Sequence, residues 1–130
     1  MSLWIPFNPN PLSLNTTDCT VRALSAALDL DWDTAYDLLV TNAGNMAVMP
    51  DSKLVIWSVL RMKGFRRRFV RDDCDFCYTV EDFAREYPVG TYVLCCDDHV
   101  VTVKDGMIWD AWDSSREIPI YYWYRKDGRK

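Results

Sequence analysis

One of the five cysteines, the only histidine and one aspartate stand in an order that suits nucleophilic catalysis by a thiol. Cys19 follows the polar, turn-forming residues 15–18 and opens an apolar helical pattern. The free N–H groups and the dipole at a helix start favour an anion, so we expect the pKa of this thiol to fall. His99 and Asp110 come later, in β-branched and aromatic segments. Attack of a thiolate on an acyl carbon needs such a base and a group that orients it.

A predicted β-hairpin brings His99 and Asp110 together. Residues 105–106 are Asp-Gly, a strong two-residue turn signal, which places Val101 opposite Asp110 and His99 opposite Trp112. Side chains alternate between the faces of a strand, so Asp110 becomes the diagonal neighbour of His99 on one face. Diagonal neighbours lie about 7–8 Å apart at Cα, close enough for their side chains to meet. Trp112 falls on the same face, where we expect it to wall a substrate groove.

The elements that position these residues predict an α+β fold, with N-terminal helices packed on a mostly antiparallel C-terminal sheet. We expect one domain over residues 1–130, divided into an extended, proline-containing arm (1–17), a mainly helical part (18–88) and an antiparallel sheet (89–124). Helices are expected at 19–28, from 33 to about 42–44, at 51–63 and at 79–87; strands are expected at 65–70, 91–96, 99–104, 107–112 and 118–124.

Composition limits the classes of partner. The chain has 130 residues, 49% of them hydrophobic, which suits one folded domain with a sizeable core. A formal net charge of −4 argues against a nucleic-acid binder, which would normally have a basic face. The one basic run, at residues 66–68, is followed by aspartates and is interpreted as a solvated strand edge rather than a phosphate site. No segment is apolar and long enough to suggest a membrane span.

Cysteine usage indicates a reducing compartment. Residues 1–7 lack the basic region and apolar core of a secretory signal, and five cysteines without such a signal predict a cytoplasmic protein with free thiols. Cys74 and Cys77 have the spacing of half a zinc site, but the remaining candidate ligands do not complete it. We therefore expect no metal and no cofactor.

Three short motifs resemble the papain-like cysteine peptidase superfamily. They are Asp18-Cys19 at the helix opening, His99-Val100-Val101, and Asp110. The segments look like small bacterial and phage papain-fold proteins, including peptidases of the bacteriocin-leader-processing type. The resemblance implies a papain-like fold in which Cys19 is the nucleophile, His99 the general base and acid, and Asp110 the orienting carboxylate.

The function that the resemblance implies is hydrolysis of a peptide or isopeptide bond in a peptide or protein substrate. Papain-like enzymes usually place a glutamine six residues before the nucleophile, where it helps to hold the oxyanion. That position is Ser13 here, and Asn15 is the nearest amide, which could serve with the backbone N–H of Cys19. Two alternatives remain open: a weakly active or inactive papain-fold module that binds protein, and deamidation or transglutamination on the same triad. The sequence does not indicate the oligomeric state.

Overall fold

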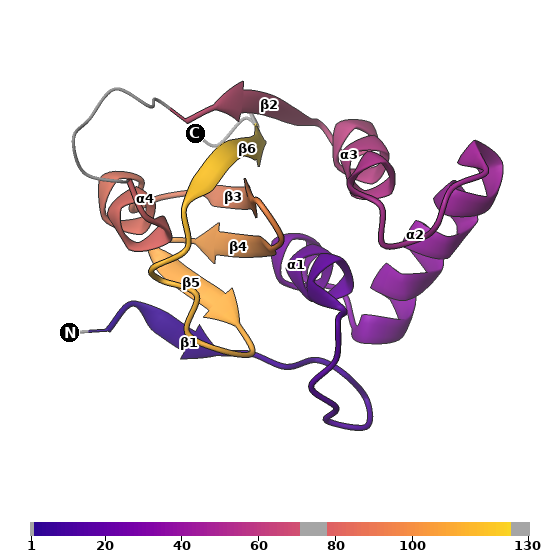
Figure 1. The fold of residues 1–130 in the computed structure, drawn as a ribbon, viewed down its shortest axis with the longest axis horizontal. Helices are drawn as coiled ribbons and strands as arrows, with labels where there is room; N and C mark the ends of the chain where they lie inside the picture. The colour runs from indigo at the N-terminus through magenta and orange to yellow at the C-terminus, as the bar shows by residue number, and fades with distance from the viewer. Residues whose placement is uncertain (1, 71–77, 126–130) are drawn as a thin grey trace.

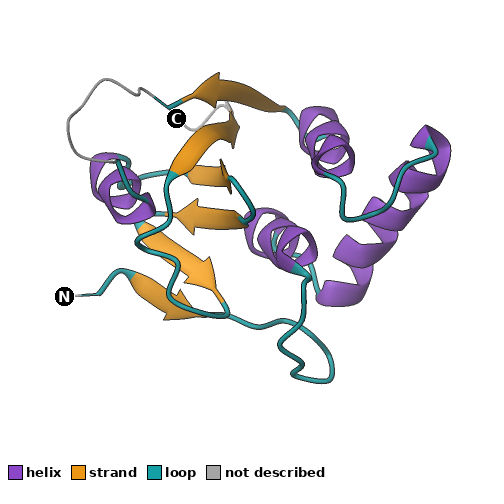
Figure 2. Ribbon diagram, viewed as in Figure 1, coloured by secondary structure: helices purple, strands orange, loops and turns teal. Residues whose placement is uncertain are grey.

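A central sheet separates two groups of helices in the computed structural model, which describes residues 2–70 and 78–125 (Figures 1 and 2). Within these residues the fold is α+β, with four helices and a six-stranded, mostly antiparallel sheet. The helices are α1 (Cys19–Leu28), α2 (Trp32–Met46), α3 (Lys53–Met62) and α4 (Val80–Glu86). The strands are β1 (Trp4–Pro6), β2 (Phe65–Phe69), β3 (Thr91–Cys96), β4 (Val100–Lys104), β5 (Met107–Asp110) and β6 (Pro119–Arg125).

The strands lie in the order β1-β5-β4-β3-β6-β2, and only the β1–β5 pairing is parallel. The predicted register next to the turn is confirmed, because Lys104 pairs with Met107 and Val103 pairs with Ile108. The ladder ends at Thr102 and Trp109, so the expected pairings of Val101 with Asp110 and of His99 with Trp112 are not formed. Both turn residues have positive φ, 51° at Asp105 and 77° at Gly106. A two-residue turn of this kind matches the twist of its strands and fixes the register of β4 against β5.

The sheet buries a hydrophobic cluster on each face. Helices α1, α2 and α3 cover one face, where Leu24, Ile56 and Trp123 are almost fully buried. Helix α4 covers the other face, where Phe83 packs with Ile108. Figure 1 shows α4 on the opposite side of the sheet from the other three helices. This double cover explains why the central strands are apolar on both faces.

Helix starts follow from local sequence. Thr79 caps α4 and forms a capping box with Asp82, in which each side chain accepts a hydrogen bond from the other's backbone N–H. The side chain of Asp31 caps α2 by accepting from the Thr34 N–H at 2.8 Å. Asp18 is the N-cap residue of α1, but its side chain makes no capping hydrogen bond. The carboxylate of Asp18 is therefore available for other partners.

The N-terminal arm differs most from the expectation. Residues 4–6 form a short edge strand that pairs in parallel with β5, rather than a separate extended arm. The indole N–H of Trp4 and the backbone N–H of Phe7 both donate to the carbonyl of Asp110, at 2.9 and 2.8 Å. The arm therefore anchors the residue that ends β5. Among the described residues, none of the helices has both the length and the apolar character needed to cross a membrane.

Candidate active site

Three elements bring Cys19, His99 and Asp110 together at one end of the sheet. Cys19 is the first residue of α1, His99 directly precedes β4, and Asp110 is the last residue of β5. Helix α1 is tied to β4 by the hydroxyl of Thr102, which donates to the carbonyl of Ala23 at 2.6 Å. The start of the helix is thus held next to the start of the strand that follows His99.

His99 and Asp110 form a buried hydrogen-bonded pair. Nε2 of His99 lies 2.6 Å from Oδ2 of Asp110, and the aspartate is only 1% exposed. The same oxygen accepts from the hydroxyl of Ser114 at 2.7 Å. Because Nε2 is engaged by the carboxylate, Nδ1 is the ring nitrogen left for the Cys19 thiol, whose pKa the neighbouring His99 lowers.

The meeting point lies beyond the ladder rather than on one face of it. Val101 in β4 and Ile108 in β5 lie two residues from His99 and Asp110, and they belong to the cluster under α4. Cys19 instead comes from α1, on the other side of the sheet. The hairpin register thus accounts for the contact between His99 and Asp110. Cys19 can reach His99 because His99 lies just before β4 and Asp110 at the end of β5, which is the same end of the sheet.

Arg22 connects the helix that carries the thiol with the aspartate that orients the histidine. Its Nε donates to Oδ1 of Asp110 at 2.9 Å, and its Nη1 donates to Oδ1 of Asp18 at 2.6 Å. The other oxygen of Asp18 accepts from the indole of Trp32 at 2.9 Å and the amide of Asn10 at 3.4 Å. Arg22 is 4% exposed, so its charge is neutralised almost entirely by these two carboxylates.

The electrostatics favour a thiolate beside an imidazolium. Burial alone would raise the pKa of the Cys19 thiol, but hydrogen bonds from His99 and the Val100 backbone and the charges of His99 and Arg22 outweigh it and lower the pKa. Burial would likewise lower the pKa of His99, yet its hydrogen bonds to Asp110 and Cys19 raise that pKa to about 9. The same interactions thus favour the thiolate form of Cys19 and the protonated form of His99.

Asp110 remains ionised within this site. Burial disfavours its charge, but the hydrogen bonds from His99 and Ser114 and the charges of His99 and Arg22 lower its pKa below the ordinary value. The two other described cysteines are different. Burial raises the pKa of Cys95 to about 11 and that of Cys96 to about 12. Among the three described cysteines, Cys19 alone has a lowered pKa.

Trp112 covers the histidine from the solvent side. Its ring centroid lies 4.6 Å from that of His99 at an interplanar angle of 40°, and the residue is 45% exposed. A tilted aromatic ring that lies against the base and is half open to solvent could contact a bound substrate. The role of Trp112 in a substrate groove stays a prediction.

The proposed oxyanion residue lies in the loop that leads into α1. Asn15 is exposed, and Ser13, at the position where papain-like enzymes usually have glutamine, has a φ of 57°. Asn10 organises this loop, since its Oδ1 accepts from the backbone N–H groups of Leu12 and Leu14 at 2.9 and 3.3 Å. Asn15 is thus next to the helix start without being fixed toward it, and its role also stays a prediction.

Sequence reasoning missed Arg22 and Ser114. An aspartate and an arginine four residues apart at a helix start usually form a surface pair of small energetic value. The signal that could have identified Arg22 is its place within the apolar run Val21-Arg22-Ala23-Leu24, which predicts that its side chain is buried. Ser114 lies in an irregular segment after β5, and no pattern in the sequence marks it.

The described part of the chain holds no group of three or more histidine, cysteine or acidic residues placed to bind a metal ion. Cys74 and Cys77, which have the spacing of half a zinc site, lie outside the described residues.

Comparison with known proteins gives no match to any family model, any curated protein or any solved structure. Function is therefore inferred from the chemistry of the residues themselves.

Proposed function

We propose that this protein is a papain-like cysteine hydrolase that cleaves a peptide or isopeptide bond through an acyl-enzyme on Cys19. The observation that carries the proposal is the linked arrangement of thiol, imidazole and carboxylate, in which Nε2 of His99 is 2.6 Å from Asp110. Order along the chain, element types and protonation states all agree with the roles of a nucleophile, a base and an orienting group.

The reaction follows from these positions. The thiolate of Cys19 attacks the acyl carbon, and the proton on Nδ1 of His99 passes to the departing amine as the C–N bond breaks. A water then gives a proton to the neutral imidazole and attacks the thioester, which releases the acid and regenerates the thiol group. Asp110 holds the ring in one orientation and stabilises the imidazolium throughout. The residues need no metal or cofactor for these steps.

The start of α1 supports stabilisation of the oxyanion. Asp18 does not cap the first N–H groups of the helix, because its carboxylate is bound to Arg22 and Trp32. Those backbone donors point at the region of Cys19 and favour negative charge there. In the proposal, the N–H of Cys19 is one oxyanion donor and the amide of Asn15 is the second.

Acyl transfer is the alternative that uses the same residues. Deamidation or transglutamination would proceed through the same thioester, so only the products distinguish it from hydrolysis. Cleavage yields two shorter peptides, deamidation converts an amide to a carboxylate, and transglutamination joins the acyl group to an added amine. A thiolate nucleophile needs reducing conditions, so we propose a cytoplasmic location.

The first test is the rate at which each cysteine is alkylated by iodoacetamide as pH varies, followed by mass spectrometry in the wild type and in His99→Ala. We expect Cys19 to react far faster than Cys95 and Cys96 near neutral pH, because only its pKa is lowered. The two buried thiols are internal controls. In His99→Ala the apparent pKa of Cys19 should rise.

The opposite result would contradict the proposal. If Cys19 reacts slowly, or titrates like an ordinary thiol whether or not His99 is present, the ion pair does not form in solution. The protein would then be pursued as a papain-fold module that binds a peptide without cleaving it.

A further inference from the structure

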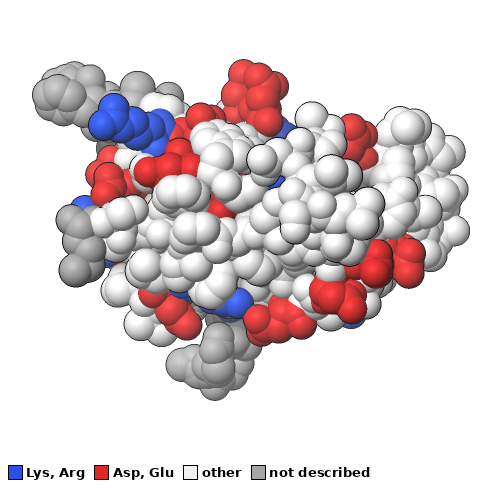
Figure 3. Space-filling view, turned by 90° about the horizontal axis from the view of Figure 1, so that it is seen from below, with Lys and Arg blue, Asp and Glu red and all other residues white. Residues whose placement is uncertain are grey.

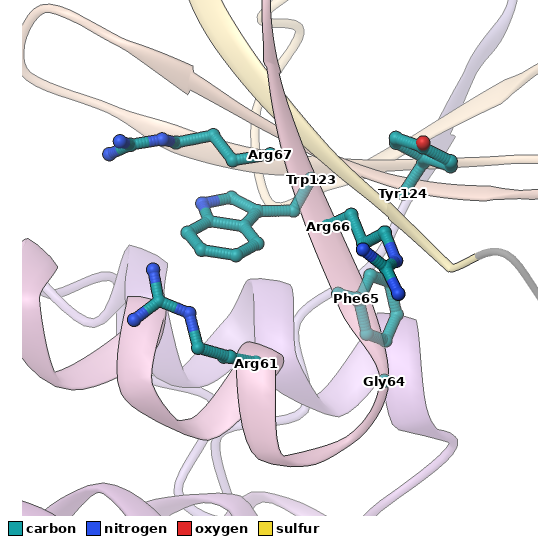
Figure 4. Close-up of a pocket in the computed structure, with 7 residues that line it drawn as sticks. All are labelled: Arg61, Gly64, Phe65, Arg66, Arg67, Trp123 and Tyr124. Atoms are coloured by element: carbon teal, nitrogen blue, oxygen red, sulfur yellow. The ribbon is translucent and has the colours of Figure 1, made fainter.

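A second surface, far from Cys19 in the sheet, concentrates positive charge. Strands β3 and β6 separate β2 from β4, so the two regions lie at different parts of the sheet. A groove of about 660 Å³ runs between the end of α3 and strands β2 and β6 (Figure 4). The side chains that define it are Arg61, Phe65, Arg66, Arg67, Trp123 and Tyr124.

Aromatic rings contact three of the arginines around this groove, Arg61, Arg67 and Arg68. The guanidinium carbon of Arg67 lies 5.0 Å from the ring centroid of Trp57, and that of Arg61 lies 5.7 Å from the ring centroid of Trp123. On the other face of β2, Arg68 lies 5.0 Å from the ring of Tyr124. A stacked guanidinium keeps its N–H groups in its own plane, where they remain available for a carboxylate.

No carboxylate within residues 2–70 and 78–125 pairs with these arginines. Arg22 binds two aspartates, and Arg85 pairs with Glu81 at 3.0 Å, whereas Arg61, Arg66 and Arg67 form no ion pair in this part of the chain. The chain as a whole carries a net charge of −4. Figure 3, which views the molecule from below, shows acidic side chains spread over that face with few basic ones. The groove is thus a local positive region on an acidic protein.

Trp123 adds an unused hydrogen-bond donor to the groove. The residue is 1% exposed, and its indole Nε1 has no acceptor among the described residues. A buried donor without a partner is costly, by about 1–3 kcal/mol in general, and such groups call for an explanation. Because this nitrogen is enclosed by protein atoms, a ligand oxygen would reach it only if the side chain of Arg61 or Arg67 moved aside.

Strand β2 is the last strand of the sheet, and its outer edge pairs with no other described strand. An open strand edge can hydrogen-bond to an extended peptide, which then becomes an additional strand. Phe65 and Arg67 point to the helical face, because Phe65 is buried there, and Arg66 and Arg68 therefore point to the other face. Positive charge thus follows the strand on both faces of its free edge.

We propose that this edge of β2 docks an extended acidic peptide segment, which adds to the sheet and places consecutive carboxylates against Arg66, Arg67 and Arg68. Successive residues of an added strand alternate between the faces, as the three arginines do, and opposite charges across neighbouring strands stabilise the pairing. A nucleic acid has no peptide groups to pair with the strand edge. The docking surface does not depend on catalysis at Cys19.

The experiment measures binding of a fluorescein-labelled peptide with three consecutive glutamates between valine and threonine residues, by anisotropy, in the Cys19→Ala variant. Controls are the same peptide with glutamines and a labelled oligothymidylate. Arg67→Gln and Arg66→Gln should each weaken binding about threefold, and the double variant about tenfold, with a smaller effect at higher salt. Arg85→Gln is the matched variant, since it removes one exposed positive charge from α4.

Saturable binding of the glutamate peptide that falls in the β2 variants, but not in Arg85→Gln, supports the proposal. Equal binding of the glutamine peptide, or equal losses in Arg85→Gln, overturns it because charge at β2 would not select the ligand. Tight binding of the oligothymidylate in place of the peptide also overturns it and assigns the groove to a nucleic acid. If no probe binds, docking is rejected, and the arginines would serve only to prevent the free strand edge from pairing with other chains. Circular dichroism checks that each variant is folded. We expect Arg66→Gln and Arg67→Gln to fold, because both positions are exposed.

Discussion

Arginine charge is paired and buried at the end of the sheet near Cys19, but exposed at the β2 edge. At the first, Arg22 is buried and its charge is divided between Asp18 and Asp110, at 2.6 and 2.9 Å. At the second, Arg61, Arg66 and Arg67 are exposed and pair with no carboxylate among the described residues, and Arg61 and Arg67 lie over aromatic rings.

The difference separates chemistry from recognition. Buried charges that neutralise one another hold their partners in one geometry, at the cost of desolvation. Exposed charges held by stacking keep their hydrogen-bonding capacity for a ligand. The first region is thus suited to a reaction inside the protein, and the second to binding from outside. Four tests break or sharpen this contrast.

Removal of the nucleophile should have the largest effect. Cys19→Ala and His99→Ala should each lower the rate of hydrolysis of a confirmed substrate by at least about 1,000-fold, since the acyl-enzyme or its proton transfer is lost. Both variants should keep the circular dichroism spectrum of the wild type. Full activity in either variant would show that the reaction does not use these residues. Arg67→Gln is the control: it changes only the β2 groove and should retain the turnover of a short neutral substrate.

Loss of the buried arginine should destabilise the fold. Arg22→Leu leaves Asp18 and Asp110 as buried carboxylates without their cation, which should lower the free energy of unfolding by about 3–5 kcal/mol. Urea denaturation followed by tryptophan fluorescence measures the change. Arg67→Leu is the matched control, and we expect its loss to stay below about 1 kcal/mol because its charge is exposed. Equal losses at the two positions would contradict the contrast.

The protonation of His99 tests the pair directly, because it is the only histidine and gives one set of imidazole NMR signals. Asp110→Asn should lower the pKa of His99, now about 9, by about 1–3 units, since a negative partner is removed. His99 must be protonated to donate to the leaving amine, so wild-type activity should fall as pH rises through about 9. In Asp110→Asn that fall should move to lower pH, and an unchanged titration would contradict the assigned role.

Local signals predicted the parts of the fold that depend on short stretches of chain. The turn at residues 105–106 fixed the pairing of Lys104 with Met107, and the cap at Thr79 marked the start of α4. The α+β class and the hairpin are confirmed, whereas the papain-like fold stays a prediction. The segment at 4–6 was not predicted as a strand, because three residues carry little pattern and their pairing with β5 depends on the assembled sheet.

The candidate site was predictable only where residue type and register were enough. Cys19, His99 and Asp110 followed from a helix start and a hairpin, and the structure brings them together. Arg22 and Ser114 were missed because their partner Asp110 is 88 and 4 residues away, and both contacts require the packing of α1 and of the loop after β5. Arg22 is too far along the chain from Asp110 for a local pattern to link them, and Ser114 lies in an irregular loop that has no pattern to read.

Trp112 is the exposed part of the first region and should show the smallest effect. Its ring lies against His99 and is 45% open to solvent, so Trp112→Ala should weaken binding of a confirmed substrate about two- to tenfold. The change should appear in KM more than in kcat, because the ring contacts bound substrate without taking part in proton transfer. Ile120→Ala removes a similarly exposed apolar side chain from β6 and is the control. Unchanged affinity in a folded Trp112→Ala protein would mean that the tryptophan only shields the histidine, which would leave recognition to surfaces outside the triad, the β2 edge among them.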